Sequence, residues 1–551
     1  MSTFNELIDF TRSTTGTYLD SVVYGDDKAN AFAGSGGSTW TVVDKNTVSG
    51  TQPTSLEYFT GIASGLTIGA QYKLELTVTN YAGNNDLGMA SAGGVGSLVR
   101  LSGNGTITSF FTATAVSLDV FMRSSNSGTI SVSVKELTGG QVSGTPLLRT
   151  AAINEPRLEY DASGNPLGLL IEEVRSNVLQ YSEGFTNTNW GKTNLTATAN
   201  AATAPDGTQT ADKLQLNSTT ASVYMVQDNS TSSSGYKTVT VYAKDNNAGY
   251  VILRVGDQPS SADRYLVLVD LSNGNVVDTA IANNPSNVSH TVTPVGNNWY
   301  RISVTANLNE SSIRVAITPY CVSSITHTNG TPTNAGGAVG NSVYIWGAQL
   351  ETGSFPTSYI PTSGSAVTRT KDLASLPVER FAYSQAQGSI VFYADVFSQG
   401  QDATPRLYEF SDGSNDNAIR LYNPPVVDRL TADVRSGGVS VFADNLDSPD
   451  FNEPFKIFQT YKVNDLSVGF NGKLEQNDTS GAVPIGIVKI NLFSKHSGSN
   501  VNNGHIKQIQ YYPKRLSNEE LELLTQPSAS PTMNLTFDGQ ATSTLVEGLH
   551  D

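Results

Sequence analysis

Short runs of alternating apolar and polar residues dominate the chain. Residues 72–78 read Tyr-Lys-Leu-Glu-Leu-Thr-Val, and residues 129–135 and 300–306 alternate in the same way. A period of two predicts strands with one buried face and one wet face, as in antiparallel sheets. Clusters of Gly, Asn, Ser and Pro separate the runs, as in sandwiches and barrels. The pattern predicts an all-β protein built from serial antiparallel β-sandwich (jelly-roll) domains.

One segment near the C-terminus has the signals of a helix. Residues 517–524 read Ser-Asn-Glu-Glu-Leu-Glu-Leu-Leu and follow a predicted strand that ends at Tyr512. Ser517 and Glu520 have the spacing of a capping box, and Leu516 and Leu521 that of a hydrophobic staple. We therefore expect one short helix after the last strand.

The first two thirds of the chain contain an internal repeat. In each copy a Trp precedes a strand that begins Tyr-Lys, an aromatic-led strand follows, and a closing strand ends in Leu or Leu-Glu. The matching segments are Trp40, 72–76, 107–113 and 129–137 in the first copy, and Trp190, 236–241, 299–306 and 342–351 in the second. We interpret this order as two sandwich domains of one type; the alternative is a coincidence among Thr-rich strands.

Two stretches carry a family resemblance. Residues 10–19 read Phe-Thr-Arg-Ser-Thr-Thr-Gly-Thr-Tyr-Leu, and residues 152–161 read Ala-Ile-Asn-Glu-Pro-Arg-Leu-Glu-Tyr-Asp, continuing through 168–177 and 181–183. Together they resemble a segment common in bacteriophage tail-fibre and other virion structural proteins. In that family the two halves are nearly contiguous. The resemblance therefore implies that the first sandwich is inserted into a host module.

The resemblance extends to the later domains. Asn189-Trp190, residues 346–351 and residues 359–362 are similar to the carbohydrate-binding-module-like jelly rolls that follow this segment in the family. Residues 511–517, Tyr-Tyr-Pro-Lys-Arg-Leu-Ser, resemble the end of a concanavalin-like (laminin-G-like) lectin sandwich, which would contain the short helix.

We expect the chain to consist of six segments. They are an N-terminal anchoring segment (1–25), a first inserted jelly roll (26–147), a connector that continues the N-terminal module (148–182), a second, carbohydrate-binding-module-like jelly roll (183–370), a concanavalin/laminin-G-like sandwich (371–526) and a C-terminal tail (527–551).

Composition narrows the range of functions. Asp and Glu total 49 against 33 Lys and Arg, a net charge of −16. Coating a nucleic acid needs a basic face, so we expect no nucleic-acid partner. No apolar run approaches the ~18 residues of a membrane span, and residues 1–6 lack the basic and apolar regions of a secretory signal. We therefore expect neither membrane insertion nor Sec-dependent export. The single cysteine, Cys321, excludes an intrachain disulfide and a thiolate zinc site.

Catalytic motifs are absent from the sequence. It contains no G-x-S-x-G, H-E-x-x-H or P-loop pattern, and its five histidines lack ligand spacing. A glycosidase needs two facing carboxylates. Glu172 and Glu173 are adjacent and would point to opposite faces of a strand, whereas Asp395 and Glu409 lie in neighbouring strand-like runs and could converge. We expect a protein that is not an enzyme, and we expect His505 to be a packed or surface histidine.

Aromatic side chains are the candidates for sugar binding. Sugar rings stack on aromatic faces while a few polar groups bind the hydroxyls. The candidate residues are Trp190, Trp299, Tyr300 and Trp346. Trp299 opens an alternating strand and Trp346 ends one, so core packing is the favoured interpretation and sugar binding is the alternative.

One acidic turn could hold a cation. Residues 412–417 read Asp-Gly-Ser-Asn-Asp-Asn, and Asp412, Asn415 and Asp416 offer the hard oxygen ligands that calcium takes from loops. The spaced acidic pattern of an EF-hand is absent, so a polar hairpin turn is the alternative. We expect no other cofactor.

These observations lead to one expected function with two alternatives. We expect a virion structural protein that is assembled in the host cytoplasm and lies on the surface of the phage particle. We expect it to bind host-surface glycans as a tail fibre or receptor-binding adhesin. Its partners would be other virion proteins, and the resemblance implies a homotrimer. The alternatives are a capsid decoration or head-fibre protein and a glycan-degrading depolymerase. A depolymerase would favour a right-handed β-helix, but no repeat of 20–30 residues is present.

Overall fold

The structure is a computed structural model of the whole chain. It describes residues 8–20, a series of strands and short stretches between 24 and 137, residues 147–527 with gaps at 231–233, 259–262, 310–311, 334, 399–403, 425–428 and 448–452, and residues 534–537 and 543–544. The chain divides into two compact units. Unit 1 contains residues 22–144, and unit 2 contains residues 7–21 and 145–548.

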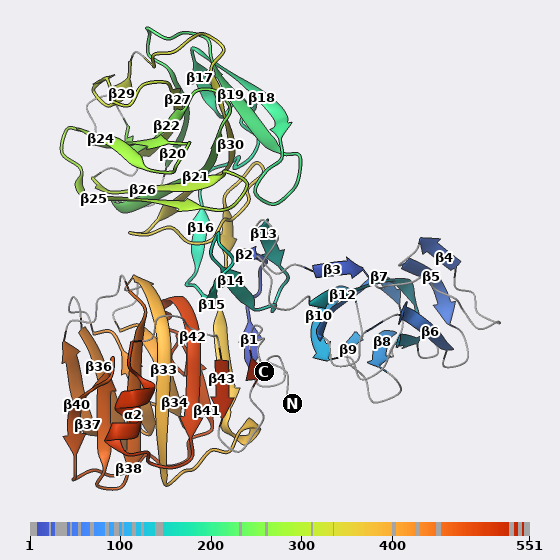
Figure 1. Cartoon of the computed structure of the whole chain (residues 1–551), viewed down its shortest axis with the longest axis vertical. Helices are drawn as coiled ribbons and strands as arrows, with labels where there is room; N and C mark the ends of the chain where they lie inside the picture. Colours follow the sequence, from blue (N-terminus) through green and yellow to red (C-terminus); the bar gives the residue numbers. More distant parts are fainter. Residues whose placement is uncertain are drawn as a thin grey trace. The chain divides into compact units, whose positions relative to one another are not determined.

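Unit 1 consists, in its described part, of strands in two antiparallel sheets (Figure 1). The larger sheet has the order β10 (Gly105–Thr112), β7 (Gln71–Ala82), β12 (Asn126–Leu137), β5 (Thr47–Gln52) and β4 (Thr41–Asp44), with β3 (Tyr24–Asp27) also on β12. The smaller sheet has the order β6 (Glu57–Ser64), β11 (Ser117–Met122), β8 (Leu87–Ala92) and β9 (Val99–Leu101). The alternating residues Tyr72, Leu74, Leu76 and Val78 of β7 are all fully buried, as the period-two pattern predicts.

The middle of unit 2 is a sandwich of two six-stranded antiparallel sheets. The first sheet has the order β17 (Gly191–Thr193), β20 (Tyr224–Ser230), β27 (Ser312–Tyr320), β22 (Tyr250–Asp257), β23 (Arg264–Asp270) and β24 (Val276–Ala282). The second has the order β18 (Leu195–Ala202), β19 (Ala211–Leu216), β30 (Ser342–Thr352), β21 (Gly235–Asp245), β26 (Tyr300–Leu308) and β25 (Ser286–Pro294). A small hairpin, β28 (His327–Thr328) with β29 (Thr331–Pro332), lies between β27 and β30 in the sequence.

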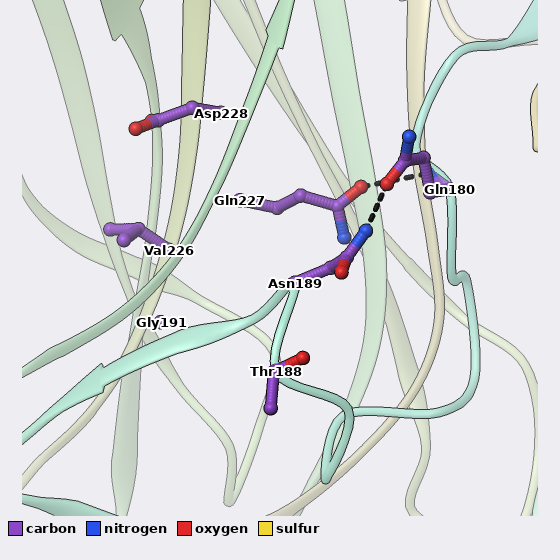
Figure 2. Close-up of a pocket in the computed structure, with 7 residues that line it drawn as sticks. All are labelled: Gln180, Thr188, Asn189, Gly191, Val226, Gln227 and Asp228. Atoms are coloured by element: carbon purple, nitrogen blue, oxygen red, sulfur yellow. Dashed lines mark hydrogen bonds between the residues drawn. The ribbon is translucent and has the colours of Figure 1, made fainter. Parts of the chain in front are cut away.

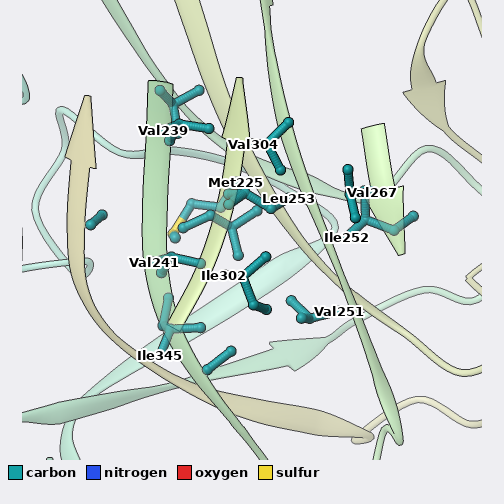
Figure 3. Packing of buried hydrophobic residues seen from close by; sticks show 14 of the residues in the cluster. Met225, Val239, Val241, Val251, Ile252, Leu253, Val267, Ile302, Val304 and Ile345 are labelled. Atoms are coloured by element: carbon teal, nitrogen blue, oxygen red, sulfur yellow. The ribbon is translucent and has the colours of Figure 1, made fainter. Parts of the chain in front are cut away.

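Aliphatic side chains from both sheets fill the space between them. Figure 3 shows Val239 and Val241 of β21 packed with Met225 of β20 and Leu253 of β22. These residues are fully buried, and apolar surface removed from water contributes roughly 25 cal/mol per Å² to folding. The hydrophobic core is therefore the main stabilising feature of this sandwich.

The C-terminal part of unit 2 is a second two-sheet sandwich. Its seven-stranded sheet has the order β1 (Asp9–Thr11), β32 (Leu373–Pro377), β41 (Lys489–Leu492), β34 (Arg406–Ser411), β35 (Ala418–Tyr422), β36 (Arg429–Ser436) and β37 (Val439–Asp447). The nine-stranded sheet has the order β14 (Arg157–Tyr160), β15 (Pro166–Ile171), β42 (Asn503–Tyr512), β33 (Gln387–Ser398), β38 (Phe455–Lys462), β39 (Leu466–Phe470) and β40 (Lys473–Asp478). In addition, β43 (Asn534–Phe537) pairs with β42, and β44 (Ser543–Thr544) pairs with β43.

The predicted C-terminal helix is present as α2 (Asn518–Leu524). The Ser517 side chain accepts a hydrogen bond from the Glu520 backbone N–H, and the Ser517 backbone N–H donates one to the Glu520 carboxylate, which is the expected capping box. Leu516 and Leu521 are buried against Val391 and Phe458 of the nine-stranded sheet. A 3₁₀ turn at Val378–Arg380 is the other helical element among the described residues, and no described helix has the length and apolarity needed to cross a membrane.

The predicted all-β, serial-sandwich fold is confirmed, with one difference in how the segments are used. We expected 1–25 and 148–182 to be an anchor and a connector, but β1, β14 and β15 are strands of the C-terminal sandwich. Residues 1–7 and most of 527–551 lie outside the described residues, whereas β43 pairs in parallel with β42. These early strands extend both sheets, and β1 and β14 form the edges.

Unit 1 is inserted between two paired strands of unit 2. Strand β2 (Gly16–Asp20) pairs antiparallel with β13 (Leu147–Ala151), and the pairing of Asp20 with Leu147 brings the two ends of unit 1 together. The inserted position that the resemblance implied therefore has a simple geometric basis. A second ribbon, β16 (Arg175–Asn177) with β31 (Val367–Arg369), similarly joins the two ends of the middle sandwich.

The sheet order supports the internal repeat. In unit 1, β7 lies between β10 and β12, and in the middle sandwich β21 lies between β26 and β30. The strand that begins Tyr-Lys is thus flanked in both copies by the aromatic-led strand and the closing strand. The facing differs, however, because Tyr72 is buried whereas Tyr236 is exposed and Lys237 is buried.

A buried network of ion pairs lies where these segments meet. Arg12 contacts Asp372 at 3.0 Å and Arg157 contacts Glu172 at 2.7 Å. Arg157 also contacts Asp372, and Arg369 lies 3.4 Å from Glu172 and 3.8 Å from Asp372. All five side chains are at most 2% exposed. We call these five residues the arginine–carboxylate network.

Hydrogen bonds complete the coordination of the network. Ser358 donates to Glu172 through its backbone N–H and its hydroxyl, both at 2.7 Å, and the backbone N–H of Glu172 donates to Asp372. Burial by itself would raise the pKa of Glu172, but the charges of Arg369 and Arg157 and the bonds from Ser358 hold that pKa far below its ordinary value. Glu172 is therefore ionised at any physiological pH.

Replacing Asp372 tests how much this network contributes to the free energy of unfolding of unit 2. Asp372→Ala would leave Arg12 and Arg157 buried with fewer counterions, and breaking a buried pair in this way costs about 3–5 kcal/mol. We expect a correspondingly lower unfolding midpoint for unit 2 in urea. The control is Asp9→Ala, because the pair of Asp9 with Arg380 is 51% and 34% exposed and should be worth under ~1 kcal/mol. Equal losses in both variants would contradict the assignment.

A second buried contact links the same segments through a histidine. His505 Nε2 of β42 lies 2.8 Å from a carboxylate oxygen of Glu159 in β14, and its Nδ1 lies 3.8 Å from Asp395 of β33. The other oxygen of Glu159 accepts the backbone N–H of Leu19 in β2. Burial opposes the charged imidazole, but hydrogen bonds with Asp395 and Glu159 outweigh it and raise the pKa of His505.

This raised pKa makes stability depend on pH with a definite sign. The contribution of His505 is fully present below the pKa of an unfolded histidine, ~6.5, and is lost as the pH rises through the higher pKa of the folded state. We expect the melting temperature to fall across that window, and His505→Gln to flatten the fall. A profile unchanged by the substitution would show that His505 is not the responsible group.

Candidate functional site

The candidate site is built on a tight turn at the entrance of the middle sandwich. The backbone N–H of Trp190 donates to the carbonyl of Asn187, and the Asn187 side chain accepts the N–H of Asn189. Asn and Asp favour such turns because their side chains bond the backbone two residues ahead. The indole of Trp190 is 1% exposed, packs against Phe185 and donates to the carbonyl of Tyr181. Trp190 therefore fixes the turn that presents Asn189.

A pocket of about 360 Å³ opens beside this turn (Figure 2). It lies along the edge of the first sheet, where Gly191 of β17 pairs with Val226 of β20. Its lining is mostly amide and hydroxyl groups, and the residues are Gln180, Thr188, Asn189, Gly191, Val226, Gln227 and Asp228. The volume falls within the range of about 300–1,000 Å³ that small-molecule sites occupy.

Three amide side chains converge in the pocket. Figure 2 shows Gln180, Asn189 and Gln227 pointing toward one another. The Asn189 amide donates to the Gln180 side chain, and the backbone N–H of Gln180 donates to Oε1 of Gln227 at 2.7 Å. Gln180 and Asn189 are exposed, whereas Gln227 is 2% exposed. The site thus combines a solvent-facing polar rim with one buried amide.

The buried amide of Gln227 has spare hydrogen-bonding capacity. Its Nε2 has no hydrogen-bond partner within the described part of the chain. A buried donor without an acceptor costs about 1–3 kcal/mol relative to a satisfied one. A ligand oxygen that accepted this N–H would recover that cost, so Gln227 is the part of the pocket that most favours a ligand.

The far side of the pocket holds an ion pair. Arg314 of β27 donates two hydrogen bonds of 2.6 Å to the carboxylate of Asp228, and the Gln258 amide donates a third at 2.8 Å. Burial opposes ionisation of Asp228, but the bonds from Arg314 and Gln258 outweigh it and lower the pKa of Asp228. Asp228 is therefore an ionised acceptor whose charge is balanced by Arg314 and whose position is fixed. Such an acceptor suits a hydroxyl group better than a cation.

The three predicted tryptophans are all buried. Trp190, Trp299 and Trp346 are 1%, 1% and 2% exposed, so none offers a free ring face to a sugar. Trp299 and Trp346 pack with Tyr359 and with Leu19 and Leu148 of the β2–β13 hairpin. The stacking role proposed for these rings is wrong, because Trp299 and Trp346 are buried in the cluster that attaches the β2–β13 pair to the sandwich and Trp190 is buried against Phe185.

Tyr300 differs from the tryptophans because it is only half-buried. Its ring lies against Gly274, where a Cβ atom would come within 2.4 Å of the tyrosine carbon Cε1. Gly274 also has a φ of +77°, which favours glycine. Tyr300 is absent from the pocket lining, so the structure does not bring it together with the amide residues.

In the predicted calcium turn, both carboxylate oxygens of Asp412 accept hydrogen bonds from within the turn. One carboxylate oxygen of Asp412 accepts the backbone N–H and hydroxyl of Ser414, at 2.8 and 2.7 Å, and the other accepts the Asn417 amide at 2.9 Å. Asn415 and Asp416 are exposed. No group of three or more His, Cys, Asp or Glu side chains suited to a metal occurs among the described residues. The geometry fits a polar hairpin turn between β34 and β35.

The candidate carboxylate pairs do not converge. Asp395 belongs to the nine-stranded sheet and faces His505, whereas Glu409 belongs to the seven-stranded sheet and contacts His496 and Arg406. Glu172 and Glu173 also turn to different partners, with Glu172 in the arginine–carboxylate network and Glu173 paired with Arg175 at 2.6 Å. Neither pair has the facing arrangement that glycoside hydrolysis uses.

Sequence reasoning missed Gln180 and Gln227. A partial signal for Gln227 existed, because Val223, Met225, Gln227 and Asn229 form a series with a spacing of two that begins just before β20, and its last two members are polar. A polar residue on an inward-facing position of a strand requires an explanation. Gln180 carried no comparable signal, since it lies outside any alternating run.

Comparisons with known proteins give only distant likenesses. No family model and no curated protein matches the chain. Among solved structures, a sheep galectin-11 complex with glycerol is 10% identical over 25% of this chain and 96% of its own, with a TM-score of 0.19. The N-terminal CBM22 tandem domain of Paenibacillus barcinonensis Xyn10C is 9% identical over 61% of this chain and 98% of its own (TM-score 0.20). Domains LG4-5 of the mouse laminin alpha1 chain are 10% identical over 52% and 84% (TM-score 0.18).

Proposed function

We propose that this chain is a structural protein of a bacteriophage particle that binds host-surface glycans as a tail fibre or receptor-binding adhesin. The single observation that carries the binding part of the proposal is the amide-lined pocket with the buried, unpaired Nε2 of Gln227. Amides placed on a rigid turn are well suited to sugar hydroxyls, because each amide both donates and accepts.

Binding in this pocket would rest on hydrogen bonds rather than on ring stacking. Gln227 would donate to a sugar oxygen, Asn189 and Thr188 would bind neighbouring hydroxyls, and Asp228 would accept from another. A single hydrogen-bonded site of this kind is weak, so a homotrimer would supply the avidity. The protein would bind without cleaving a bond, and its other partners would be virion proteins.

The proposed place on the particle is supported by the residues that resemble the virion family. Arg12, Arg157 and Glu172 belong to the two stretches that carry the resemblance, and all three are members of the arginine–carboxylate network. The resembling segment is therefore the device that holds the sandwich modules together. A modular, polar, acidic protein of this kind fits the particle surface, either as a fibre or as capsid decoration.

Glycan binding is tested with the full-length protein on a glycan array. We expect a defined set of host-type glycans to bind, and Gln227→Met to weaken binding about tenfold, which corresponds to about 1.4 kcal/mol for one hydrogen bond. Gln209→Ala, an exposed amide elsewhere on the same sandwich, is the matched control and should bind normally. Equal binding by all three proteins would exclude this pocket as the site.

The place on the particle is tested by immunogold labelling of purified virions. We expect label on the tail, together with a trimer in sedimentation equilibrium. Label on the capsid would instead establish the decoration role, and absence from virions would overturn the proposal. Incubation with host polysaccharide followed by a reducing-end assay separates an adhesin from a depolymerase, since turnover would contradict the non-enzymatic role.

A further inference from the structure

Three polar side chains lie inside the apolar core of the middle sandwich, near one end of it. Asn229, Lys237 and Asp257 are 9%, 0% and 2% exposed. An unpaired charge or amide is strongly disfavoured in such surroundings. A fully buried lysine that is followed in its strand by Thr238, Val239, Thr240 and Val241 therefore needs a physical reason.

The three residues come from β20, β21 and β22, and all three side chains face the space between the two sheets. Asn229 and Asp257 lie on either side of Ile313 in the intervening strand β27. Asn229 lies two positions beyond Gln227 and four beyond Met225 in β20, Lys237 lies two before Val239 in β21, and Asp257 continues the inward series of Leu253 in β22. The pairing of these segments shows no register shift. Figure 3 shows Met225, Val239 and Leu253 packed together in the core. Alternation therefore directs all three polar side chains inward.

Topology places them at the same end of the sandwich. Strand β20 ends at Ser230 and β21 begins at Gly235, so Asn229 and Lys237 flank one connection. Strands β21 and β22 are joined by a short turn after Asp245, which brings the start of β21 level with the end of β22. In the repeated unit the corresponding strand instead buries its tyrosine, Tyr72.

The chemical state of these groups favours reaction. Lys237 Nζ and Asn229 Nδ2 have no hydrogen-bond partner in the described residues. Burial lowers the pKa of Lys237, and the charge of Asp257 opposes this only in part. A desolvated lysine is neutral more often, and the neutral amine is the nucleophile.

We propose that Lys237 and Asn229 are joined by an intramolecular isopeptide bond, with Asp257 as the proton carrier. The neutral Nζ attacks Cγ of Asn229, the new C–N bond forms, and the Cγ–Nδ2 bond breaks. Asp257 accepts one proton from Nζ and passes it to the departing nitrogen, which leaves as ammonia. Atoms and charges balance, and the step needs no oxidant, cofactor or second substrate. Proximity in a folded core replaces external catalysis.

The bond would join strands of opposite sheets. β20 belongs to the first sheet of the sandwich and β21 to the second. A cross-link limits the separation of the two sheets in the unfolded and partly unfolded states, as a disulfide does, and this chain has one cysteine and so no intrachain disulfide. A surface protein under mechanical load would gain resistance to pulling.

The mass of the intact, purified full-length protein tests the proposal directly. We expect a mass lower than the sequence mass by one ammonia molecule. Lys237→Arg, Asn229→Ala and Asp257→Asn should restore the mass of their own sequences. Lys244→Arg is the matched control on the same strand and should retain the loss. A folded wild-type protein with the full sequence mass would overturn the proposal without reference to any variant.

Peptide mapping then locates the bond. Ammonia can also leave an Asn-Gly sequence such as Asn273-Gly274 as a cyclic imide, so total mass alone is insufficient. Chymotryptic cleavage after Tyr236 separates Asn229 from Lys237 in an uncross-linked chain. We expect a branched peptide that contains both residues after this cleavage. Two separate peptides, with the ammonia loss elsewhere, would contradict the assignment.

Discussion

The arrangement of unit 2 depends on a buried set of charges. Arg12, Arg157 and Arg369 surround Glu172 and Asp372 with almost no access to solvent. Removing charges from water is costly, and only close contacts with further hydrogen bonds offset that cost. The network provides both, since Ser358 and the backbone N–H of Glu172 fill the remaining acceptor positions. Segments that are far apart in the sequence are thereby held in one geometry, because no partner can leave without stranding a charge.

The arginine–carboxylate network explains how large modules can be inserted into one sandwich. The C-terminal sandwich takes strands from the beginning, the middle and the end of the chain, as β1, β15 and β42 show. Unit 1 is inserted where Asp20 meets Leu147, and the middle sandwich is inserted at the ribbon of β16 and β31. An insertion whose two ends are adjacent adds little strain to its host. The C-terminal sandwich can therefore carry both inserted modules.

The tryptophans pack in the core, whereas amide side chains line the pocket, and the sequence alone does not reveal this difference. Trp299 and Trp346 bind the β2–β13 hairpin to the sandwich, and Trp190 secures the turn beside the pocket. The polar groups that could meet a ligand are glutamine and asparagine side chains brought together from that turn and from β20. Burial of a large ring is worth more to folding than its exposure would be to weak binding. The proposed glycan site is consequently an amide site held in place by tryptophans.

The sequence by itself determined the secondary structure, the two-sheet modules, the capped helix and the order of the repeat, because alternation and capping are local properties. Tertiary structure decided that β1, β14 and β15 belong to the last sandwich, since the partners of Arg12 and Arg157 lie hundreds of residues away. It also decided the facing of Lys237, because a shift of one residue in a strand exchanges the inner and outer faces. The pocket could not be predicted from the sequence, because Gln180, Asn189 and Gln227 become neighbours only when β17 pairs with β20.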